Sequence, residues 1–245
     1  MICLENVTKK YGTKVAVNNL NLDIPQGELF AFIGPNGAGK TTTAKMMVGL
    51  LAPTAGRITI GGKDISRDHL EAKRILAYIP DQSFCYDKLS GREFLKFMSD
   101  MYNIEPDTFK QESDKYINLF KMNDYIDQLT DTYSLGMKQR LVISATLLHH
   151  PKVIIVDEPL VGIDPMSARL VKRLFKDETR NNGTTIFMST HFLPVAEEIA
   201  DRIGVIHHGK LIALGKFEEL KAKSQTVGAL EDVFMKLVGE PRYPE

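Results

Sequence analysis

The sequence predicts an α/β protein with a mainly parallel β-sheet, an N-terminal antiparallel β subdomain and a helical lobe. Three observations support this fold class. A continuously apolar segment at 29–33 runs into a glycine-rich loop and then into a helical pattern. Strand and helix patterns alternate again after about residue 150, which is typical of a parallel sheet. Between these two parts, residues from about 90 to 130 carry only helical patterns.

Length and composition exclude several classes of protein. The 245 residues suffice for one large α/β domain. The 31 Lys and Arg residues balance 31 Asp and Glu residues, so no nucleic-acid partner is expected. No apolar run approaches the roughly 20 residues that a membrane-spanning helix needs. We also expect no signal peptide, and hence a cytoplasmic location, because the chain does not open with a basic segment followed by an apolar one.

The first 60 residues predict a small antiparallel sheet and one buried strand. From Met1 to about Ile60 the pattern is strand-like, with apolar residues alternating with polar ones in strands that bury one face. The run Leu29–Ile33 is continuously apolar, as expected of a strand buried on both faces. A helix should follow from about Lys40, after the glycine-rich turn.

A helical lobe is expected next. Ser90 and Glu93 form a capping-box pattern, in which each side chain bonds the backbone N–H of the other residue. Apolar residues then recur at helical spacing up to Met101. Pro106 is typical of the first position of a second helix, which we expect to end near Met122.

The second half of the chain predicts alternating helices and strands. The expected elements are, in order, a helix from about Leu135, the strand Val153–Val156, a helix begun by Asp164 and Pro165, the strand Thr185–Ser189, a hairpin of Ile203–Ile206 with Leu211–Leu214, and a closing amphipathic helix over Leu230–Leu237. We divide this single domain into a core of residues 1–88 and 151–215, a helical lobe of about 89–150 and a helical tail of 216–245.

The segment Gly34–Thr41 matches the phosphate-loop pattern G-x-x-x-x-G-K-[ST] and stands between a buried strand and a helix, as that loop requires. Glycines let successive backbone N–H groups curl around a polyphosphate, and the helix N-terminus adds partial positive charge. Lys40 should reach the β- and γ-phosphates, Thr41 should ligate Mg²⁺ and Thr42 should support the α-phosphate. The residues expected to bind nucleotide here are Gly34, Pro35, Asn36, Gly37, Ala38, Gly39, Lys40, Thr41 and Thr42.

Two acids at the end of another apolar strand complete the pattern of a phosphate-loop nucleoside triphosphatase (NTPase) core. Asp157 directly follows Val153–Val156 and is expected to hold Mg²⁺. Glu158 is expected to orient and polarise the water that attacks the γ-phosphate in line. Such a pair alone is usually a solvated strand end, but the phosphate loop in the same chain favours catalysis. No Asn/Thr-Lys-x-Asp motif for reading guanine occurs, which favours ATP over GTP.

With these motifs in place, the chain resembles the ATP-binding cassette (ABC) subunits that drive transporters, over nearly its whole length. The segment Tyr133–Arg140 resembles the family signature Leu-Ser-Gly-Gly-Gln followed by a basic helix. Ser134 is a natural N-cap, and the backbone N–H of Gly136 is open to a γ-phosphate. Two cassettes of this family pack head to tail, with each ATP between the phosphate loop of one and the signature helix of the other. The resemblance therefore implies hydrolysis in a dimer, whereas the segment read alone is a plain capped helix.

Three more residues correspond to elements of the family. Asp164 resembles the loop residue that crosses the dimer interface, and it is also an ordinary N-cap before a proline. His191 resembles the switch histidine that contacts the γ-phosphate and helps to hold Glu158 and the water. Tyr11 resembles the aromatic residue that stacks on adenine. Read without the family, a lone histidine after a strand is more often structural, and a tyrosine at a turn carries little information.

Two departures from the family pattern leave details open. The family usually places Gln after a Pro in the loop before the helical lobe, where it touches Mg²⁺ and senses the membrane subunits. Alignment on Pro80 gives that place to Asp81, whereas the side-chain type gives it to Gln82; we keep both and slightly favour Gln82 as the metal ligand. Leu135 and Met137 replace the first Gly and the Gln of the signature. Because Met137 has no amide to offer the ribose, the remaining Ser and Gly of the signature should carry more of that contact.

The resemblance implies an ATP-binding and ATP-hydrolysing subunit, with ATP and Mg²⁺ as ligands, that powers a membrane transporter. The implied partners are a second copy or a homologous cassette and transmembrane subunits, which would hold the chain at the cytoplasmic face of the membrane. The signature variant and the tail at 229–234 resemble export-type cassettes of bacterial drug, peptide, lipid or ion efflux. An importer cassette is the near alternative, and a soluble ABC-type ATPase not coupled to transport is the more distant one.

Overall fold

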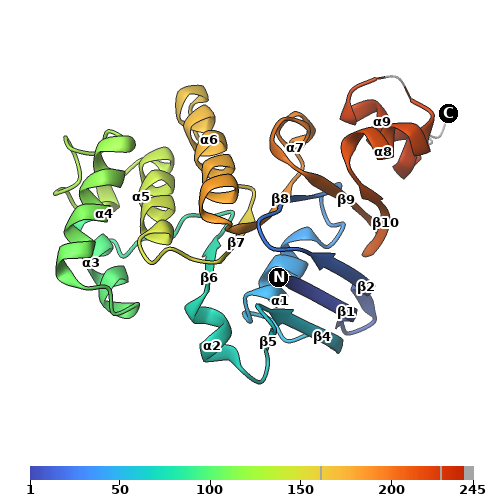
Figure 1. Cartoon of the computed structure of the whole chain (residues 1–245), viewed down its shortest axis with the longest axis horizontal. Helices are drawn as coiled ribbons and strands as arrows, with labels where there is room; N and C mark the ends of the chain where they lie inside the picture. Colours follow the sequence, from blue (N-terminus) through green and yellow to red (C-terminus); the bar gives the residue numbers. More distant parts are fainter. Residues whose placement is uncertain (161, 227, 240–245) are drawn as a thin grey trace.

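The computed structural model describes residues 1–160, 162–226 and 228–239. It is an α/β structure with two β-sheets, and helix α1 (Lys40–Met47) contacts strands of both of them (Figure 1). Helices α3, α4 and α5 gather at the end of the molecule opposite α8 and α9 (Figure 1). Among the described residues, no helix combines the length and apolar character that crossing a membrane requires.

The first sheet is the antiparallel subdomain that the alternating pattern predicted. Its four strands lie in the order β2-β1-β4-β5, and β1 pairs antiparallel with both β2 and β4. The strands are β1 (Ile2–Tyr11), β2 (Lys14–Ile24), β4 (Ala55–Ile60) and β5 (Lys63–Asp64). The apolar side chains of β1, including Ile2, Leu4 and Val7, are buried, as one-faced strands require.

The second sheet has six strands in the order β10-β9-β3-β8-β7-β6. Neighbouring strands from β9 to β6 pair parallel, and β10 pairs antiparallel with β9 as the predicted hairpin. The strands are β3 (Leu29–Ile33), β6 (Leu76–Ile79), β7 (Val153–Asp157), β8 (Thr185–Thr190), β9 (Arg202–His207) and β10 (Lys210–Gly215). The mainly parallel sheet is therefore confirmed, and β6 is a strand that the sequence patterns did not indicate.

Strand β3 is buried on both faces, as its continuous apolar run predicted. Leu29, Ala31 and Ile33 share one hydrophobic core with α6 (Pro165–Asn182) and α7 (Leu193–Ile199). Phe30 and Phe32 point the other way, into a core shared with α1 and the antiparallel sheet. Because successive side chains of a strand point to opposite faces of the sheet, β3 contributes to both cores.

The expected helical lobe consists of α3 (Gly91–Met101), α4 (Pro106–Leu119) and α5 (Leu135–Leu147), which contact one another. Ser90 and Glu93 form the predicted capping box at the start of α3. Helix α4 ends at Leu119, three residues before Met122, because the chain turns at Lys121 with a positive φ of 53°. A short 3-10 turn at Thr130–Thr132 leads into α5.

The sequence patterns did not indicate α2 (His69–Arg74) or α7, whereas α8 (Phe217–Ser224) lies within the helical tail expected over 216–245. The predicted closing helix is α9 (Leu230–Val238), which packs against α7 and α8. Its first backbone N–H, that of Leu230, donates to the Glu197 carboxylate on α7 at 2.8 Å. The tail is thereby attached to the main sheet through α7.

Phe187 lies at the centre of the core beside α1, and its loss should destabilise the whole fold. Its ring lies 5.3 Å from that of Phe32 and 6.0 Å from that of Phe30, and its side chain is fully buried. We expect Phe187→Ala to lower the free energy of unfolding by about 3–5 kcal/mol, measured by urea titration. Phe84→Ala is the matched control, because that side chain is 69% exposed. Equal midpoints for the two variants would contradict this account of the core.

Candidate active site

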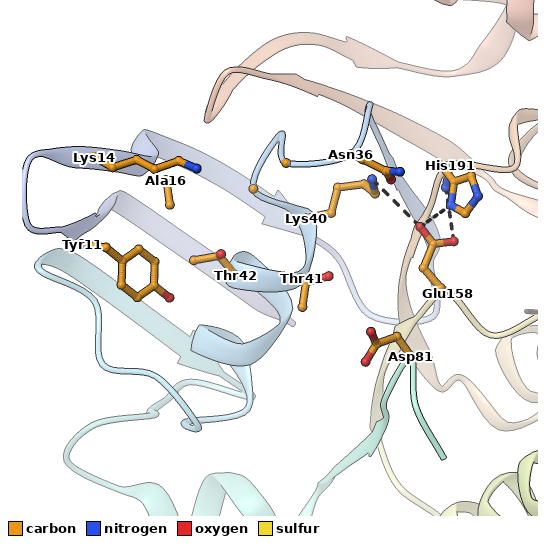
Figure 2. Close-up of a pocket in the computed structure, with 12 residues that line it drawn as sticks. Tyr11, Lys14, Ala16, Asn36, Lys40, Thr41, Thr42, Asp81, Glu158 and His191 are labelled. Carbon is orange, nitrogen blue, oxygen red and sulfur yellow. Dashed lines mark hydrogen bonds and ion pairs between the residues drawn. The ribbon is translucent and has the colours of Figure 1, made fainter. Parts of the chain in front are cut away.

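A cavity of about 580 Å³ lies beside the phosphate loop and the start of α1 (Figure 2). Most of the side chains predicted to bind nucleotide or water line it: Tyr11, Asn36, Gly37, Gly39, Lys40, Thr41, Thr42, Glu158 and His191. They come from the end of β1, the loop after β3, the start of α1, and the residues that directly follow β7 and β8. Segments far apart in the sequence therefore form one site.

The glycines of the phosphate loop are required by its shape. Gly39 has a φ of 113°, which L side chains rarely adopt, and a Cβ there would lie 2.6 Å from the carbonyl oxygen of Ala16. A Cβ on Gly34 would lie 2.3 Å from the carbonyl oxygen of Ile206. The loop is also fixed from the β9–β10 turn, because the backbone N–H of Gly209 donates to the Ala38 carbonyl at 2.9 Å. These contacts hold the loop in its curled conformation.

Lys40 is a buried cation directed into the cavity (Figure 2). Its Nζ donates to the carbonyl oxygens of Gly34 at 2.7 Å and Pro35 at 3.2 Å, and lies 4.0 Å from Oε1 of Glu158. Burial lowers the pKa of the Lys40 ammonium, and the carboxylates of Glu158 and Asp157 oppose that shift. An anion entering the cavity would stabilise the charged form of this lysine.

Asp157 has the environment of a metal ligand. It is fully buried at the end of β7, and its Oδ1 accepts a hydrogen bond from the Ser189 hydroxyl. Its Oδ2 has no hydrogen-bond partner among the described residues. Burial raises the pKa of Asp157, and the Ser189 hydroxyl and the nearby Thr41 hydroxyl oppose that rise. A buried carboxylate oxygen without a partner, beside a hydroxyl, fits the oxygen ligands that Mg²⁺ prefers.

Glu158 is held in one orientation by the end of β8. Its Oε1 lies 2.7 Å from Nδ1 of His191, while its Oε2 accepts from the Thr190 hydroxyl at 3.1 Å and the His191 backbone N–H at 3.3 Å. The backbone of Glu158 has a φ of 52°, an uncommon value for a residue with a side chain. Figure 2 shows its carboxylate between Lys40 and His191. Lys40 and His191, which were predicted to act at the γ-phosphate together with Glu158, thus both lie next to its carboxylate.

Asp81, and not Gln82, lines the cavity. Figure 2 shows the Asp81 carboxylate on the same side of the cavity as Thr41 and Glu158. Asp81 stands two residues after the end of β6 at Ile79. The position given by alignment on Pro80 therefore lies at the cavity, whereas Gln82, the residue favoured for its amide, does not line it.

Tyr11 lies at the end of the cavity away from Glu158, beside Lys14 and Ala16 (Figure 2). Its ring is about half exposed, and the ammonium of Lys9 lies 5.3 Å from the ring centre. An exposed aromatic ring at the end of a cavity offers an apolar face on which a flat ring can stack. The sequence patterns did not indicate Lys14 or Ala16, whose positions depend only on how β2 passes the phosphate loop.

Ser134, Gly136 and Asp164 do not line this cavity. Ser134 caps α5, accepting from the backbone N–H of Met137 at 3.3 Å. Asp164 caps α6, accepting from the backbone N–H of Ser167 at 3.0 Å, and pairs with the guanidinium of Arg140 at 2.5 Å. Hydrogen bonds from Ser167 and the charge of Arg140 hold the pKa of Asp164 well below its usual range. The three predicted residues thus form a second group, held together by α5 and α6.

Comparison with known proteins identifies the family. The family model described as "ABC transporter" matches residues 17–161. The chain belongs to the ABC transporter ATP-binding family. ABC cassettes of this family bind and hydrolyse ATP, so the chain is an ATPase of this family. The resemblance seen in the sequence is confirmed.

Relatives in this family cover nearly the whole chain. The bacitracin transport ATP-binding protein BcrA of Bacillus licheniformis is 36% identical over 90% of this chain and 71% of its own length. The linearmycin resistance ATP-binding protein LnrL of Bacillus subtilis is 33% identical over 96% of this chain and 78% of its own. A solved ATP-binding subunit of an ABC transporter superposes with a TM-score of 0.93 at 26% identity, covering 98% of this chain and all of that one. The α/β fold class of the ABC cassette is thereby confirmed.

Adding a methyl group to Gly39 should distort this ABC phosphate loop. The backbone must move away from Ala16, and its N–H groups can then no longer converge on a phosphate. We expect Gly39→Ala to weaken ATP binding at least about tenfold, which corresponds to about 1.4 kcal/mol. Isothermal titration calorimetry measures this change.

Gly62→Ala provides the control for backbone strain alone. Gly62 also has a positive φ, of 77°, but a Cβ there meets nothing within 4 Å and the residue lies outside the cavity. Comparable ATP affinities for the Gly39 and Gly62 variants would rule out the close approach to Ala16 as a requirement for binding.

Proposed function

We propose that the chain is the ATPase cassette of an exporter and that it works as a head-to-tail dimer with two composite ATP sites. In this proposal transmembrane subunits hold it at the cytoplasmic face of the membrane. The observation that carries the dimer is the separation of the signature residues from the cavity. Lys40 and Glu158 face one cavity, whereas Ser134 and Gly136 do not line it. A phosphate bound at Lys40 therefore needs a second chain to bring a signature helix to it.

Exposed apolar side chains accompany the residues that a second copy would contact. Met166, just after Asp164, is 75% exposed. Leu135 in the signature and Phe192 after His191 are also exposed. Large apolar groups beside functional loops are typical of surfaces that a partner covers. Their positions support a dimer that closes over these three segments.

In the proposed reaction the phosphate loop and Lys40 bind the β- and γ-phosphates of ATP, and Thr42 supports the α-phosphate. Glu158 orients a water molecule for attack in line with the bond to the leaving ADP and draws a proton from it. His191 and Thr190 hold the Glu158 carboxylate in place for that step. Tyr11 stacks on the adenine, and the partner's copies of Ser134, Gly136 and Asp164 complete the site.

The residues proposed to hold Mg²⁺ are Thr41 and Asp157. The buried Oδ2 of Asp157, which has no partner among the described residues, supports this assignment. Asp81 is the better placed of the two loop candidates because it lines the cavity, and Gln82 becomes the less favoured one. Bound Mg²⁺ would neutralise charge on the phosphate oxygens. In this proposal α1 contributes Thr41 and β7 contributes Asp157 as the two metal ligands.

An aromatic patch supports docking to membrane subunits. It consists of Phe84, Tyr86 and Phe97, with Tyr86 packed edge-on against Phe84 at 5.4 Å and against Phe97 at 5.3 Å. All three side chains are exposed. The patch begins three residues after Asp81 in the chain and continues onto α3, so a partner bound there contacts the segment that connects the ATP cavity with the helical lobe. Exposed aromatic residues are enriched where proteins associate.

The exporter assignment rests on relatives and on the signature variant. The relatives are named for bacitracin transport and linearmycin resistance. Transporting a toxic compound out of the cell gives resistance to it. We also propose the division into a core of 1–88 and 151–215, a lobe of about 89–150 and a tail of 216–245. The positions of α3, α4 and α5 in one cluster support the lobe.

Replacing the proposed base should stop turnover and trap the dimer. Glu158→Gln keeps the shape of the side chain but cannot accept a proton, so we expect the turnover number for ATP to fall at least about a hundredfold. We also expect this variant to become dimeric in ATP by multi-angle light scattering, because ATP then persists between the two chains. Glu218→Gln, an exposed change on α8, is the control. Normal turnover in Glu158→Gln would refute the proposed base, and an ATP-insensitive monomer would refute the shared site.

Removing the most exposed ring of the aromatic patch should weaken the membrane complex. We expect Phe84→Ala to co-purify from native membranes with several-fold less of the transmembrane subunits that a tagged wild-type chain retains, since interface aromatics often contribute about 2 kcal/mol or more. Leu70→Ala, which removes an equally exposed apolar side chain on α2, is the control. Equal recovery with both variants would place the membrane contact elsewhere.

A further inference from the structure

The side chain of Gln139 is a buried amide inside the apolar face of α5. It is 2% exposed, and Leu141 and Ile143 beyond it on the helix are fully buried. Burying an amide is unfavourable unless both of its ends find hydrogen-bond partners. Gln139 does find them, but on two different segments outside its own helix.

One end of the amide reaches the loop after β6. The Oε1 of Gln139 accepts a hydrogen bond from the Ser83 hydroxyl. Ser83 stands two residues after Asp81, which lines the ATP cavity. The position of the Asp81 loop is therefore linked to α5.

The other end reaches the segment after β7. The Nε2 of Gln139 donates to the carbonyl oxygen of Pro159 at 3.2 Å. Pro159 directly follows Glu158, whose backbone has the uncommon φ of 52°. The carbonyl of Pro159 lies in the peptide bond between Pro159 and Leu160, so fixing it restricts the segment next to Glu158 and hence the backbone that aims its carboxylate.

The next residue of α5 holds the far end of the same segment. Arg140 pairs with Asp164 at 2.5 Å, five residues beyond Pro159. Adjacent residues of one helix thus hold both ends of the connection that leads away from Glu158. A shift of α5 against the sheet must change either these contacts or the position of that connection.

We propose that Gln139 is a positioning residue for ATP hydrolysis, joining α5 to the two cavity walls that carry Asp81 and Glu158. It touches neither nucleotide nor water. Its hydrogen bond to the Pro159 carbonyl fixes the position of Glu158. Its hydrogen bond from the Ser83 hydroxyl makes that position depend on the conformation of the Asp81 loop. This inference rests on the proposed function, because it assumes that Glu158 acts on the attacking water.

Gln139→Leu is the main test, since leucine fills a similar volume in an apolar site without an amide. We expect the turnover number for ATP to fall about tenfold or more, as small displacements of a catalytic group do. The KM for ATP should change less than about twofold, because Lys40 and the phosphate loop are untouched. Gln111→Leu, an exposed change on α4, is the matched control and should leave both constants unchanged.

A double-mutant cycle with Ser83 separates positioning from general damage to the fold. Ser83→Ala should lower the turnover number in the wild-type chain and have no further effect in the Gln139→Leu background, because Ser83 acts through Gln139. Equal proportional losses in both backgrounds would overturn the proposal. Wild-type turnover in Gln139→Leu would overturn it as well. If Gln139→Leu does not fold, wild-type turnover in Ser83→Ala alone is sufficient to refute it.

Measuring Glu158→Gln in the same assay separates a failure of this proposal from a failure of the proposed function. Unchanged turnover in Glu158→Gln refutes the assigned base. Loss of turnover in Glu158→Gln together with independent effects at Ser83 and Gln139 refutes only the positioning role.

Discussion

The register of the parallel sheet is the constraint on which the site depends. Ile33 at the end of β3 pairs with Thr190 on β8, and Asp157 at the end of β7 pairs with Ser189. Three strands therefore stop at one edge, and the phosphate loop, the acidic pair and His191 all leave from it. A slip of one residue would turn every side chain of a strand to the opposite face. The hydrogen bond between Ser189 and Asp157 exists only in the observed register.

Burial leaves the charged groups at this edge short of partners. Lys40 bonds two carbonyl oxygens, and the nearest carboxylate oxygen lies 4.0 Å away. Burial lowers the pKa of Lys40 and raises that of Asp157, so in both groups it favours the neutral form. A polyphosphate with its cation brings the opposite charge to each of them. The free chain is thus arranged so that binding its ligand relieves an electrostatic cost of folding.

Sequence patterns predicted the parts whose conformation depends on local chemistry. Five consecutive apolar residues identify β3, glycine spacing identifies the phosphate loop, and the Ser90–Glu93 box marks the start of α3. Strand β6 was missed because four residues are too few to show a clear hydrophobic periodicity. Its hydrogen-bonded pairing with β7 is what makes this segment a strand. The sequence also left Asp81 and Gln82 both open, because alignment on Pro80 and side-chain type favoured different residues, and only the structure shows that Asp81 lines the cavity. Gln139 carried no signal, since a glutamine in a helical pattern is normally exposed.

In the proposed dimer, helix α5 takes part in two sites at once. Its first turn, with Ser134 and Gly136, faces the ATP of the partner, while Gln139 and Arg140 lie about one turn further on and contact the segment after the chain's own Glu158. A helix rises only about 1.5 Å per residue, so these two groups of residues move together as one stiff unit. Coupling between two sites is reciprocal in binding free energy. Nucleotide contact at one site would therefore bias the geometry of the other, and a buried amide within an apolar helix is the group that makes the connection.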